Sequence, residues 1–182
     1  MTDGTSNTAV FSEIAIGRGG TDMNVKSGVV YADGATFRDE PVLRFITPLD
    51  CASHRGEGGV LKLAGNITAT GFISDKGHRW GDSRHRYTSF VAMVPPNSVS
   101  CRTNDDQWGA MAASSYHTGG VNVGIGDGSV TFVSDTINCG NQALRLGEDR
   151  GHTGRPNEYT GPSTYGAWGA LGSAAGGDQT TL

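Results

Sequence analysis

The stretch "SSYHTGGVNVGIGDGSVTFV", residues 114–133, decides the fold because it has the pattern of two β-strands joined by a tight turn. In its first half, Val121, Val123 and Ile125 alternate with polar or glycine positions. Alternation of this kind is typical of a strand that buries one face. We therefore expect these three side chains to lie in the core.

The turn of this hairpin is predicted at Asp127-Gly128. A two-residue type I′ turn requires positive φ, which glycine adopts without strain. After such a turn the chain returns as a second strand, with Val130 and Phe132 on the core face. The sequence thus predicts an antiparallel hairpin as the centre of the fold.

The composition extends this prediction to the whole chain. The 182 residues include 29 glycines, and Ser, Thr, Val and Asn occur throughout, which indicates many short strands joined by turns. The predicted fold class is α+β, mainly β, with an antiparallel sheet and long Gly-rich loops. The length favours a single domain over residues 1–182, in which 148–182 form a partly irregular C-terminal wrap. Its expected anchors are Trp168, Leu171 and Ala175.

Two further strands are expected on either side of the glycine-rich middle of the chain. In "TAVFSEIAI", residues 8–16, alternation places Ala9 and Phe11 against the core. The β-rich segment from Tyr87 to Val94 predicts a strand that ends at the following Pro-Pro pair, since proline lacks the N–H that a ladder needs.

The charge distribution excludes one class of partner. The formal net charge is −4, and the 14 Lys and Arg residues are scattered apart from a local run at Arg79, Arg84 and Arg86. No basic stripe is present to follow phosphates, so we expect no nucleic-acid partner. No apolar run approaches a membrane span, so the chain alone is expected to be soluble, with the cytoplasm as one location.

Residues at the chain start repeat the chemistry of the predicted turn. Asp3, Thr5 and Asn7 stand at alternate positions, which is the ligand spacing in the first half of a calcium loop. The remaining ligands of an EF-hand are missing. Two interpretations of His117 and Asp127 remain: ordinary turn chemistry, or part of a site that a second acidic loop completes.

Several motifs in order resemble one known family. "DGTSNTAVFSE", "VPPNSVSC", "SSYHTGGVNVGIGDGSVTFVS" and "WGALGSAAGGD" are similar to the prepilin-type processing-associated H-X9-DG domain, a planctomycete domain of unknown function. His117, nine intervening residues and Asp127-Gly128 match the pattern that gives the family its name. The resemblance runs from residue 1 to about residue 178.

The resemblance implies a pseudopilin-like head domain with a structural role in assembly. The implied partners are other pilin-like subunits or envelope components, and the implied location is the cell envelope, the periplasm or the extracellular space. Members carry an N-terminal leader and a hydrophobic helix, which this sequence does not show. The chain is therefore interpreted either as a piece of a longer product or as a form that acts alone.

The resemblance also implies a calcium ion, because related heads bind one in a Gly- and Asp-rich loop. The expected ligands are Asp3, Asn7 and Asp127, with His117 as the hydrogen-bond partner that holds Asp127, since imidazole is a poor ligand for calcium. From spacing alone the three cysteines allow one disulfide or three thiols. The family pattern favours a Cys51–Cys101 disulfide.

The main rival hypothesis is a hydrolase that uses calcium or zinc and acts on a lactone or ester, such as an acyl-homoserine lactone. Its catalytic residues would be His117, Asp127 and His85, the last from the polar stretch "GHRWGDSRHRY". A third hypothesis is a binding module for peptide or glycan, with an exposed aromatic patch of Trp80, Trp108 or Trp168. No glycine-rich stretch fits a dinucleotide fingerprint, so no nucleotide cofactor is expected.

Overall fold

The computed structural model describes residues 3–20, 23–32, 35–36, 44–103, 109–144 and 161–177. The strands are β1 (Ala9–Ser12), β2 (Val29–Ala32), β3 (Ala35–Thr36), β4 (Arg44–Phe45), β5 (Ala69–Ile73), β6 (Ser100–Arg102), β7 (Gly109–Ala110), β8 (Gly120–Ile125) and β9 (Val130–Ser134). The helices are α1 (Pro48–Ala52), α2 (His85–Thr88), α3 (Gly166–Leu171) and the 3₁₀ turns η1 (Thr5–Asn7) and η2 (Glu57–Gly59). Short strands outnumber short helices, which confirms the predicted mainly β class.

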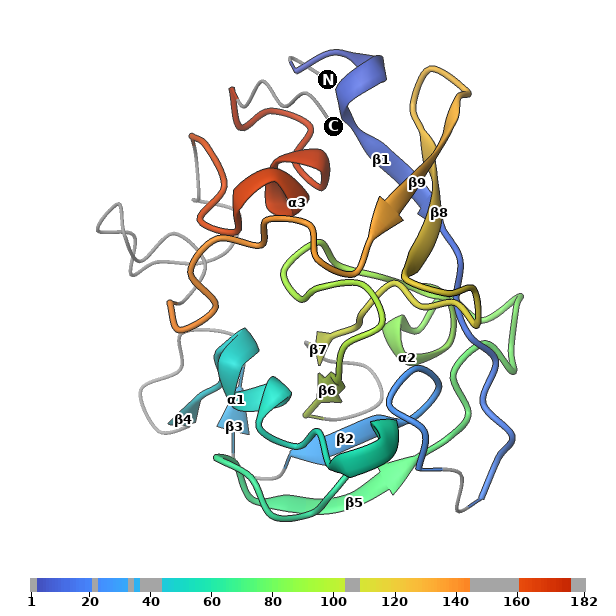
Figure 1. Cartoon of the computed structure of the whole chain (residues 1–182), viewed down its shortest axis with the longest axis vertical. Helices are drawn as coiled ribbons and strands as arrows, with labels where there is room; N and C mark the ends of the chain where they lie inside the picture. The colour runs from blue at the N-terminus through green and yellow to red at the C-terminus, as the bar shows by residue number, and fades with distance from the viewer. Residues whose placement is uncertain are drawn as a thin grey trace.

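Two larger sheets lie toward opposite ends of the molecule (Figure 1). The first has the order β1-β8-β9 and is antiparallel throughout. The second has the order β5-β2-β6-β7, in which β2 and β6 run parallel and the other pairs antiparallel. A small parallel pair, β3-β4, accompanies the second sheet. The sheets are thus partly mixed rather than purely antiparallel.

The predicted hairpin is confirmed as β8-β9, but its turn has three residues instead of two. The N–H of Ile125 donates to the carbonyl of Ser129 (2.9 Å), and that of Gly128 to the carbonyl of Ile125 (3.0 Å). Only Gly128 in this turn has positive φ, at 90°. This is a three-residue loop with a left-handed glycine, in place of a type I′ turn.

The longer turn shifts the register of the returning strand by one residue. Val121 pairs with Val133, which is buried, whereas Val130 and Phe132 are exposed. A shift of one residue moves every side chain of a strand to the other face. The predicted burial of Val130 and Phe132 was therefore wrong, while that of Val121 and its neighbours on β8 is confirmed.

Two other sequence-based expectations need correction. Phe11 of β1 is 73% exposed, because it pairs with Gly124 on the outer side of the sheet. No strand covers Tyr87 to Val94; instead α2 forms, and its backbone closes local turns such as Tyr87 N–H to Arg84 carbonyl (3.0 Å).

The C-terminal segment packs onto the first sheet through α3. Trp168 is fully buried, stacks near Phe90 with 6.1 Å between ring centroids, and donates from Nε1 to the carbonyl of Val94 (2.8 Å). Leu171 is buried as predicted, whereas Ala175 is exposed and anchors nothing. In the described part of the chain, no helix has the length and apolar character that crossing a bilayer requires.

Candidate functional site

His117 and Glu13 form a contact pair at the entrance to β8. Glu13 follows β1, and its backbone N–H donates to the carbonyl of Asn122 (3.2 Å). The Oε2 atom accepts the N–H of Asn122 (2.7 Å), while Oε1 lies 3.2 Å from Nε2 of His117. Pairing of β1 with β8 thus places a carboxylate against the imidazole that the sequence singled out.

The environment of Glu13 keeps its carboxylate charged. Burial alone raises the pKa of Glu13, but hydrogen bonds from Asn122 and Ser115 and the nearby His117 imidazole lower it below its usual value. A carboxylate on one ring nitrogen fixes the orientation and tautomer of an imidazole. His117 remains accessible to solvent, with 62% of its side chain exposed.

Lys26 holds the backbone of the turn in front of β8. Its Nζ donates to the carbonyls of Ser115 (2.7 Å) and His117 (3.3 Å). The Ser115 hydroxyl in turn accepts the N–H of His117 (3.2 Å). The exposed imidazole therefore rises from a fixed backbone.

Asp127 lies at the other end of β8 from His117. The six extended residues of β8 span about 20 Å, so the strand itself separates the two side chains. Oδ1 of Asp127 accepts the N–H of Ser129 (2.9 Å), and hydrogen bonding to Ser129 lowers the pKa of Asp127. The predicted His117–Asp127 hydrogen bond was wrong, because each residue has its partner at its own end of the strand.

Asp3 and Asn7 are brought together near the hairpin turn. The Nδ2 atom of Asn7 donates to the carbonyl of Asp3 (3.0 Å), and the N–H of Gly126 donates to the carbonyl of Thr8 (2.9 Å). The Asp3 carboxylate accepts the N–H groups of Gly176 (2.8 Å) and Gly177 (2.9 Å). Asp3 therefore joins the first and the last segment that the structure describes.

The described residues hold no group of three His, Cys, Asp or Glu side chains arranged to bind a metal. Backbone N–H groups donate hydrogen bonds to the carboxylates of Asp3 and Asp127. These donors occupy acceptor positions on the oxygens that a calcium ion would use. Calcium binding by Asp3, Asn7 and Asp127 stays a prediction for metal analysis.

His85 belongs to a different element from His117. It opens α2, and its ring packs against Gly109, where a Cβ atom would lie 2.8 Å from ring atoms. The structure thus holds the two imidazoles separately, one on Gly109 and one on Glu13. A catalytic role for His85 stays a prediction.

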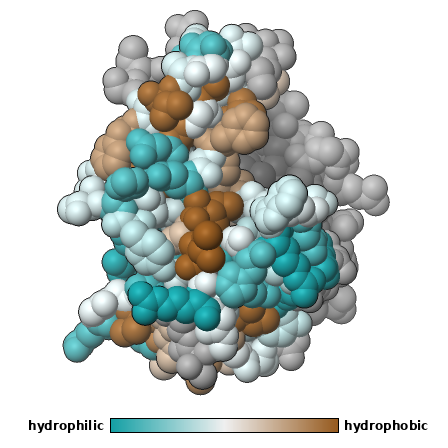
Figure 2. Space-filling view, turned by 90° about the vertical axis from the view of Figure 1, so that its right-hand side faces the viewer, coloured by the Kyte–Doolittle hydropathy of each residue, from teal (hydrophilic) through white to brown (hydrophobic). Residues whose placement is uncertain are grey.

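The outer surface of the first sheet is apolar. We define the outer face as Phe11 of β1 with Val130 and Phe132 of β9, which are 73%, 70% and 52% exposed. Figure 2 views this side of the molecule and shows hydrophobic surface in its upper part, where β1, β8 and β9 lie. Sequence periodicity placed all three side chains in the core, so it missed this surface.

Two glycines of β8 form the floor of the outer face. A Cβ atom at Gly120 would lie 2.6 Å from the Phe132 ring, and one at Gly124 would lie 3.4 Å from Cβ of Phe11. The two phenylalanines therefore lie against bare backbone. The alternating glycines in this strand are the sequence signal for the arrangement.

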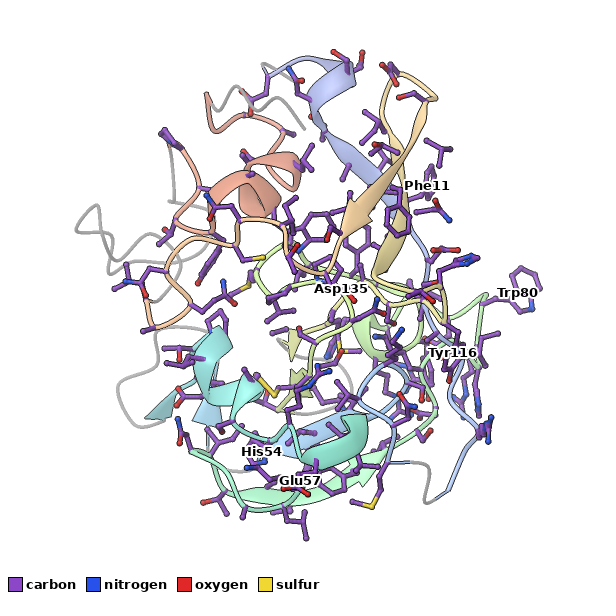
Figure 3. The ribbon with its side chains drawn as sticks, viewed as in Figure 1. Phe11, His54, Glu57, Trp80, Tyr116 and Asp135 are labelled. Atoms are coloured by element: carbon purple, nitrogen blue, oxygen red, sulfur yellow. A yellow bond between two sulfur atoms is a disulfide. The ribbon has the colours of Figure 1, made fainter. Side chains whose placement is uncertain are left out.

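The two tryptophans that the structure describes differ in their exposure to solvent. Trp80 is 91% exposed, whereas Trp168 is buried, so Trp168 belongs to no surface patch. Trp108 lies outside the described residues. Figure 3 shows Trp80 projecting on the same side of the molecule as Phe11 and Tyr116.

Asn97 is a structural residue that the sequence analysis missed. It has φ of 57°, and its amide accepts the N–H of Ser115 (2.8 Å) and donates to Asp135 (2.7 Å) and to the carbonyl of Gly120 (3.2 Å). The "PPN" loop therefore fixes both ends of the segment that carries His117. An asparagine after two prolines was the available signal, because asparagine tolerates left-handed backbone.

Lys76 is a fully buried lysine in a neutral environment. Nζ contacts the carbonyl of Ala112 (2.7 Å) and the hydroxyl of Ser114 (2.8 Å), with the Ser100 hydroxyl and the Lys26 carbonyl at 3.3 Å. Burial lowers the pKa of Lys76 to about 7. Ser100 and Ser114 are equally buried, so the cluster joins four segments of the chain inside the protein.

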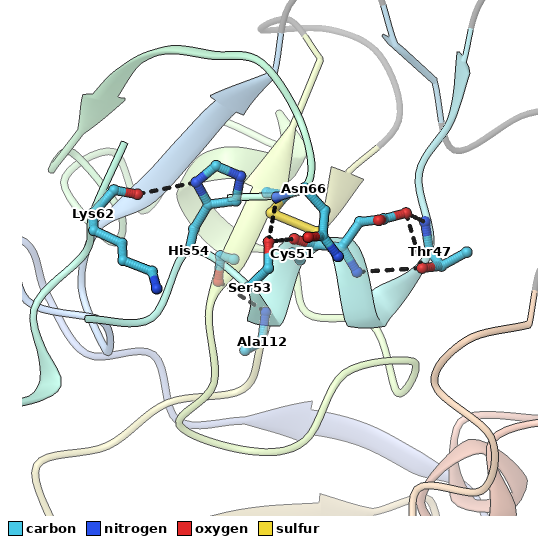
Figure 4. The surroundings of a disulfide bond; sticks show 10 residues. Thr47, Cys51, Ser53, His54, Lys62, Asn66 and Ala112 are labelled. Atoms are coloured by element: carbon cyan, nitrogen blue, oxygen red, sulfur yellow. Dashed lines mark hydrogen bonds between the residues drawn. A yellow bond between two sulfur atoms is a disulfide. The ribbon is translucent and has the colours of Figure 1, made fainter. Parts of the chain in front are cut away.

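Cys51 and Cys101 form a disulfide, which confirms the pairing implied by the family resemblance (Figure 4). The bond joins α1 to β6 inside the core, and Cys139 is free and buried. Thr47 caps α1 in a capping box with Asp50, which fixes the helix that presents Cys51. The disulfide thus joins segments 50 residues apart.

A comparison with protein-family models matches residues 1–140 to the family described as "Protein of unknown function (DUF1559)". The matched range contains both disulfide cysteines, Glu13, His117 and the β8-β9 hairpin, and it ends before α3. No curated protein and no solved structure matches the chain.

Proposed function

This chain belongs to the DUF1559 family, and from this starting point we propose that it is a non-catalytic assembly module that binds a second copy of itself through the outer face. The observation that carries the proposal is the exposure of Phe11, Val130 and Phe132 on one side of a sheet. Full burial of one such side chain contributes about 1.5–3 kcal/mol, so leaving three exposed favours a partner.

The outer face suits self-association for two reasons. First, its residues are uncharged, and the Glu13 carboxylate beside it already contacts the Asn122 N–H and the His117 ring. Second, β1 and β9 are both edge strands of the described sheet, which allows continued strand pairing between copies. The resemblance to pseudopilin heads, which assemble from like subunits, supports the same role.

Sedimentation velocity over a range of concentrations tests this proposal. We expect the wild-type chain to shift from monomer to dimer as concentration rises, and Phe132→Ser and Phe11→Ser to remain monomeric. Leu63→Ser is the matched control, since Leu63 is 55% exposed outside the outer face. Because each copy has net charge −4, added salt should strengthen the dimer. A monomeric wild type, or dimers unaffected by Phe132→Ser, would reject the proposal.

The disulfide supports a location outside the reducing cytosol. Disulfides persist in the periplasm and the extracellular space and are rare in cytosolic proteins. The Cys51–Cys101 bond therefore favours the envelope location over the cytoplasm. Quantifying free thiols in protein isolated from its native host tests this: one free thiol is expected, from Cys139, and three would contradict it.

Calcium remains part of the proposal as a stabiliser of the chain start and hairpin turn, with Asp3, Asn7 and Asp127 as the residues to test. Its support is the approach of η1 to the turn, where the Gly126 N–H meets the Thr8 carbonyl. Elemental analysis and a thermal melt with and without EDTA give the result. A metal-free preparation whose melting temperature is unchanged by EDTA and by added calcium would reject calcium binding.

Hydrolysis of a lactone or ester is the second candidate function, favoured by the Glu13–His117 pair. With Nε2 of His117 on the Glu13 carboxylate, Nδ1 is the nitrogen that takes a proton from water. A panel of acyl-homoserine lactones and nitrophenyl esters tests it. An enzyme of this kind should lose at least about 100-fold in rate on His117→Gln. Turnover no higher than in a mock preparation would reject it.

A further inference from the structure

The loop that presents Trp80 is tightly held at its base. We define the Trp80 loop as residues 75–88, between β5 and the end of α2. The N–H of Gly77 donates to the carbonyl of Tyr87 (2.9 Å), and the hydroxyl of Thr88 donates to the carbonyl of Asp82 (3.0 Å). These bonds close the loop on itself. Trp80 is therefore exposed from a fixed backbone.

Three arginines of the Trp80 loop surround one buried aromatic ring. The guanidinium carbons of Arg79, Arg84 and Arg86 lie 4.9, 5.3 and 4.4 Å from the centre of the Tyr87 ring. Such cation–π contacts fix the direction of each side chain. The cluster concentrates positive charge in a chain whose net charge is −4.

Two carboxylates offset most of this charge. Asp82 accepts from Nε and Nη2 of Arg84 at 2.6–3.1 Å, and Asp75 lies 3.4 Å from Arg86. The Arg84 hydrogen bonds lower the pKa of Asp82 to about 2. Arg79 lies farther from Asp82, at 3.7 Å, and its side chain is 57% exposed. The loop therefore presents one guanidinium to solvent with weak compensation.

A second exposed aromatic side chain is connected to this loop. The hydroxyl of Tyr116 donates to the carbonyl of Ile16 (3.3 Å), and the His78 ring bonds to the carbonyl of Gly17. Residues 16–17 thus lie between Tyr116 and the Trp80 loop. Tyr116 is 57% exposed and projects on the same side as Trp80 (Figure 3).

We propose that Trp80 and Arg79 form a binding site for an acidic polysaccharide. The Trp80 indole stacks on the C–H face of a sugar ring, and the Arg79 guanidinium pairs with the carboxylate of that ring or the next. Tyr116 extends the contact to a neighbouring sugar. No part of this site belongs to the outer face.

The balance between rings and charge distinguishes a polysaccharide from a nucleic acid. Duplex DNA presents one charge per about 1.7 Å, and its binding depends on many cations. This site offers one weakly compensated guanidinium beside large aromatic surface. An acidic polysaccharide has one carboxylate on each sugar ring and apolar ring faces. It therefore matches a site with one guanidinium and a large aromatic surface.

Isothermal titration of the full chain with polygalacturonate tests the proposal. We expect saturable binding that Trp80→Ala weakens by roughly tenfold, the loss expected for one stacked ring. Arg79→Gln should weaken binding of polygalacturonate but leave binding of its uncharged methyl ester unchanged. Phe11→Ser is the matched control: it removes an exposed ring of the outer face and should leave polysaccharide binding intact.

Three results would overturn the proposal. One is failure of the wild-type chain to bind polygalacturonate, and another is unchanged binding by Trp80→Ala. The third is tighter binding of oligothymidylate than of polygalacturonate, which would assign the site to nucleic acid. Because Trp80 is 91% exposed, a thermal melt of Trp80→Ala should match the wild type and confirm that the variant is folded.

Discussion

Single side chains in this protein connect segments that are far apart in sequence through hydrogen bonds. Lys76 is the clearest case, since its Nζ reaches the Lys26 carbonyl as well as the backbone and hydroxyls of the segments around Ala112 and Ser114. Neutral acceptors satisfy its hydrogen bonds, but none of these contacts compensates its charge fully. Burial therefore lowers the pKa of Lys76 to about 7.

The stability of the fold should rise with pH because of Lys76. Between pH 7 and about 10, the unfolded chain keeps a proton on this lysine that the folded chain has released. The free energy of unfolding should then increase by at most about 1.4 kcal/mol per pH unit over that window, and show no contribution from Lys76 below pH 7. Urea denaturation at several pH values measures the slope. Lys76→Met should remove it, and the exposed Lys62→Met should keep it; a slope that survives Lys76→Met contradicts this assignment.

Asn97 is the second connecting residue. Its contribution to stability has two parts: the hydrogen bonds of its side chain and its tolerance of positive φ. Asn97→Ala loses the bonds to Ser115, Gly120 and Asp135 and also places alanine at positive φ. We expect a loss of about 2–4 kcal/mol in unfolding free energy. Asn97→Gly removes the same bonds without the backbone strain and should recover about 1 kcal/mol. Equal unfolding free energies of the two variants in chemical denaturation would show that alanine at this positive φ causes no backbone strain.

At the scale of elements, the β8-β9 hairpin determines both the core and the exposed surface. Its inner side buries Val121, Val123 and Val133, and its outer side holds Phe132 over Gly120. Addition of one residue to the turn decides which side chains fall on which face. The outer face is thus a consequence of loop length.

The two floor glycines should respond differently to the same substitution. A Cβ atom at Gly120 would lie 2.2 Å from the Val133 carbonyl, so Gly120→Ala should cost about 1–3 kcal/mol. At Gly124 the nearest atom is Cβ of Phe11 at 3.4 Å, an ordinary contact, and Gly124→Ala should change stability by less than about 1 kcal/mol. Thermal melts of the two variants give the comparison. A larger loss for Gly124→Ala would mean that the register is different.

The limits of sequence-based prediction are visible in this same hairpin. Alternation in β8 correctly placed Val121, Val123 and Ile125, because a strand buried on one face shows its period directly. The phase of β9 depended on the turn, and "GDGS" is compatible with two-residue and three-residue loops. His117 and Asp127 were linked by a motif spacing, whereas the nine residues between them, six of which form β8, hold them apart. The contact of Glu13 with His117 could not be predicted from the sequence, because it depends on the register between β1 and β8.

The whole molecule is held together by bonds between distant parts of the chain. Asp3 contacts the backbone of Gly176 and Gly177, so the first and last described residues meet. The Cys51–Cys101 bond joins α1 to β6 of the second sheet and closes a loop of 50 residues. Few of these connections are local, so the glycine-rich chain depends on each of them.

Removal of the disulfide should strongly destabilise the molecule. Closing a loop of this length contributes about 4 kcal/mol in the chain-entropy description. The double variant Cys51→Ala/Cys101→Ala should lose stability of that order in urea denaturation, whereas Cys139→Ala, which replaces a free thiol, should lose much less. Similar losses for the two variants would show that packing of the sulfurs, and not the cross-link, provides the stability.

Hydrogen–deuterium exchange at low and high protein concentration tests the assembly role most directly, because it locates the contact between copies. The account predicts slower exchange at high concentration for the backbone amides of β1 and β9, next to Phe11 and Phe132. The amides of β5, an edge strand of the other sheet, should exchange at the same rate in both samples. Exchange that is independent of concentration everywhere, or protection confined to β5, would contradict association through the outer face.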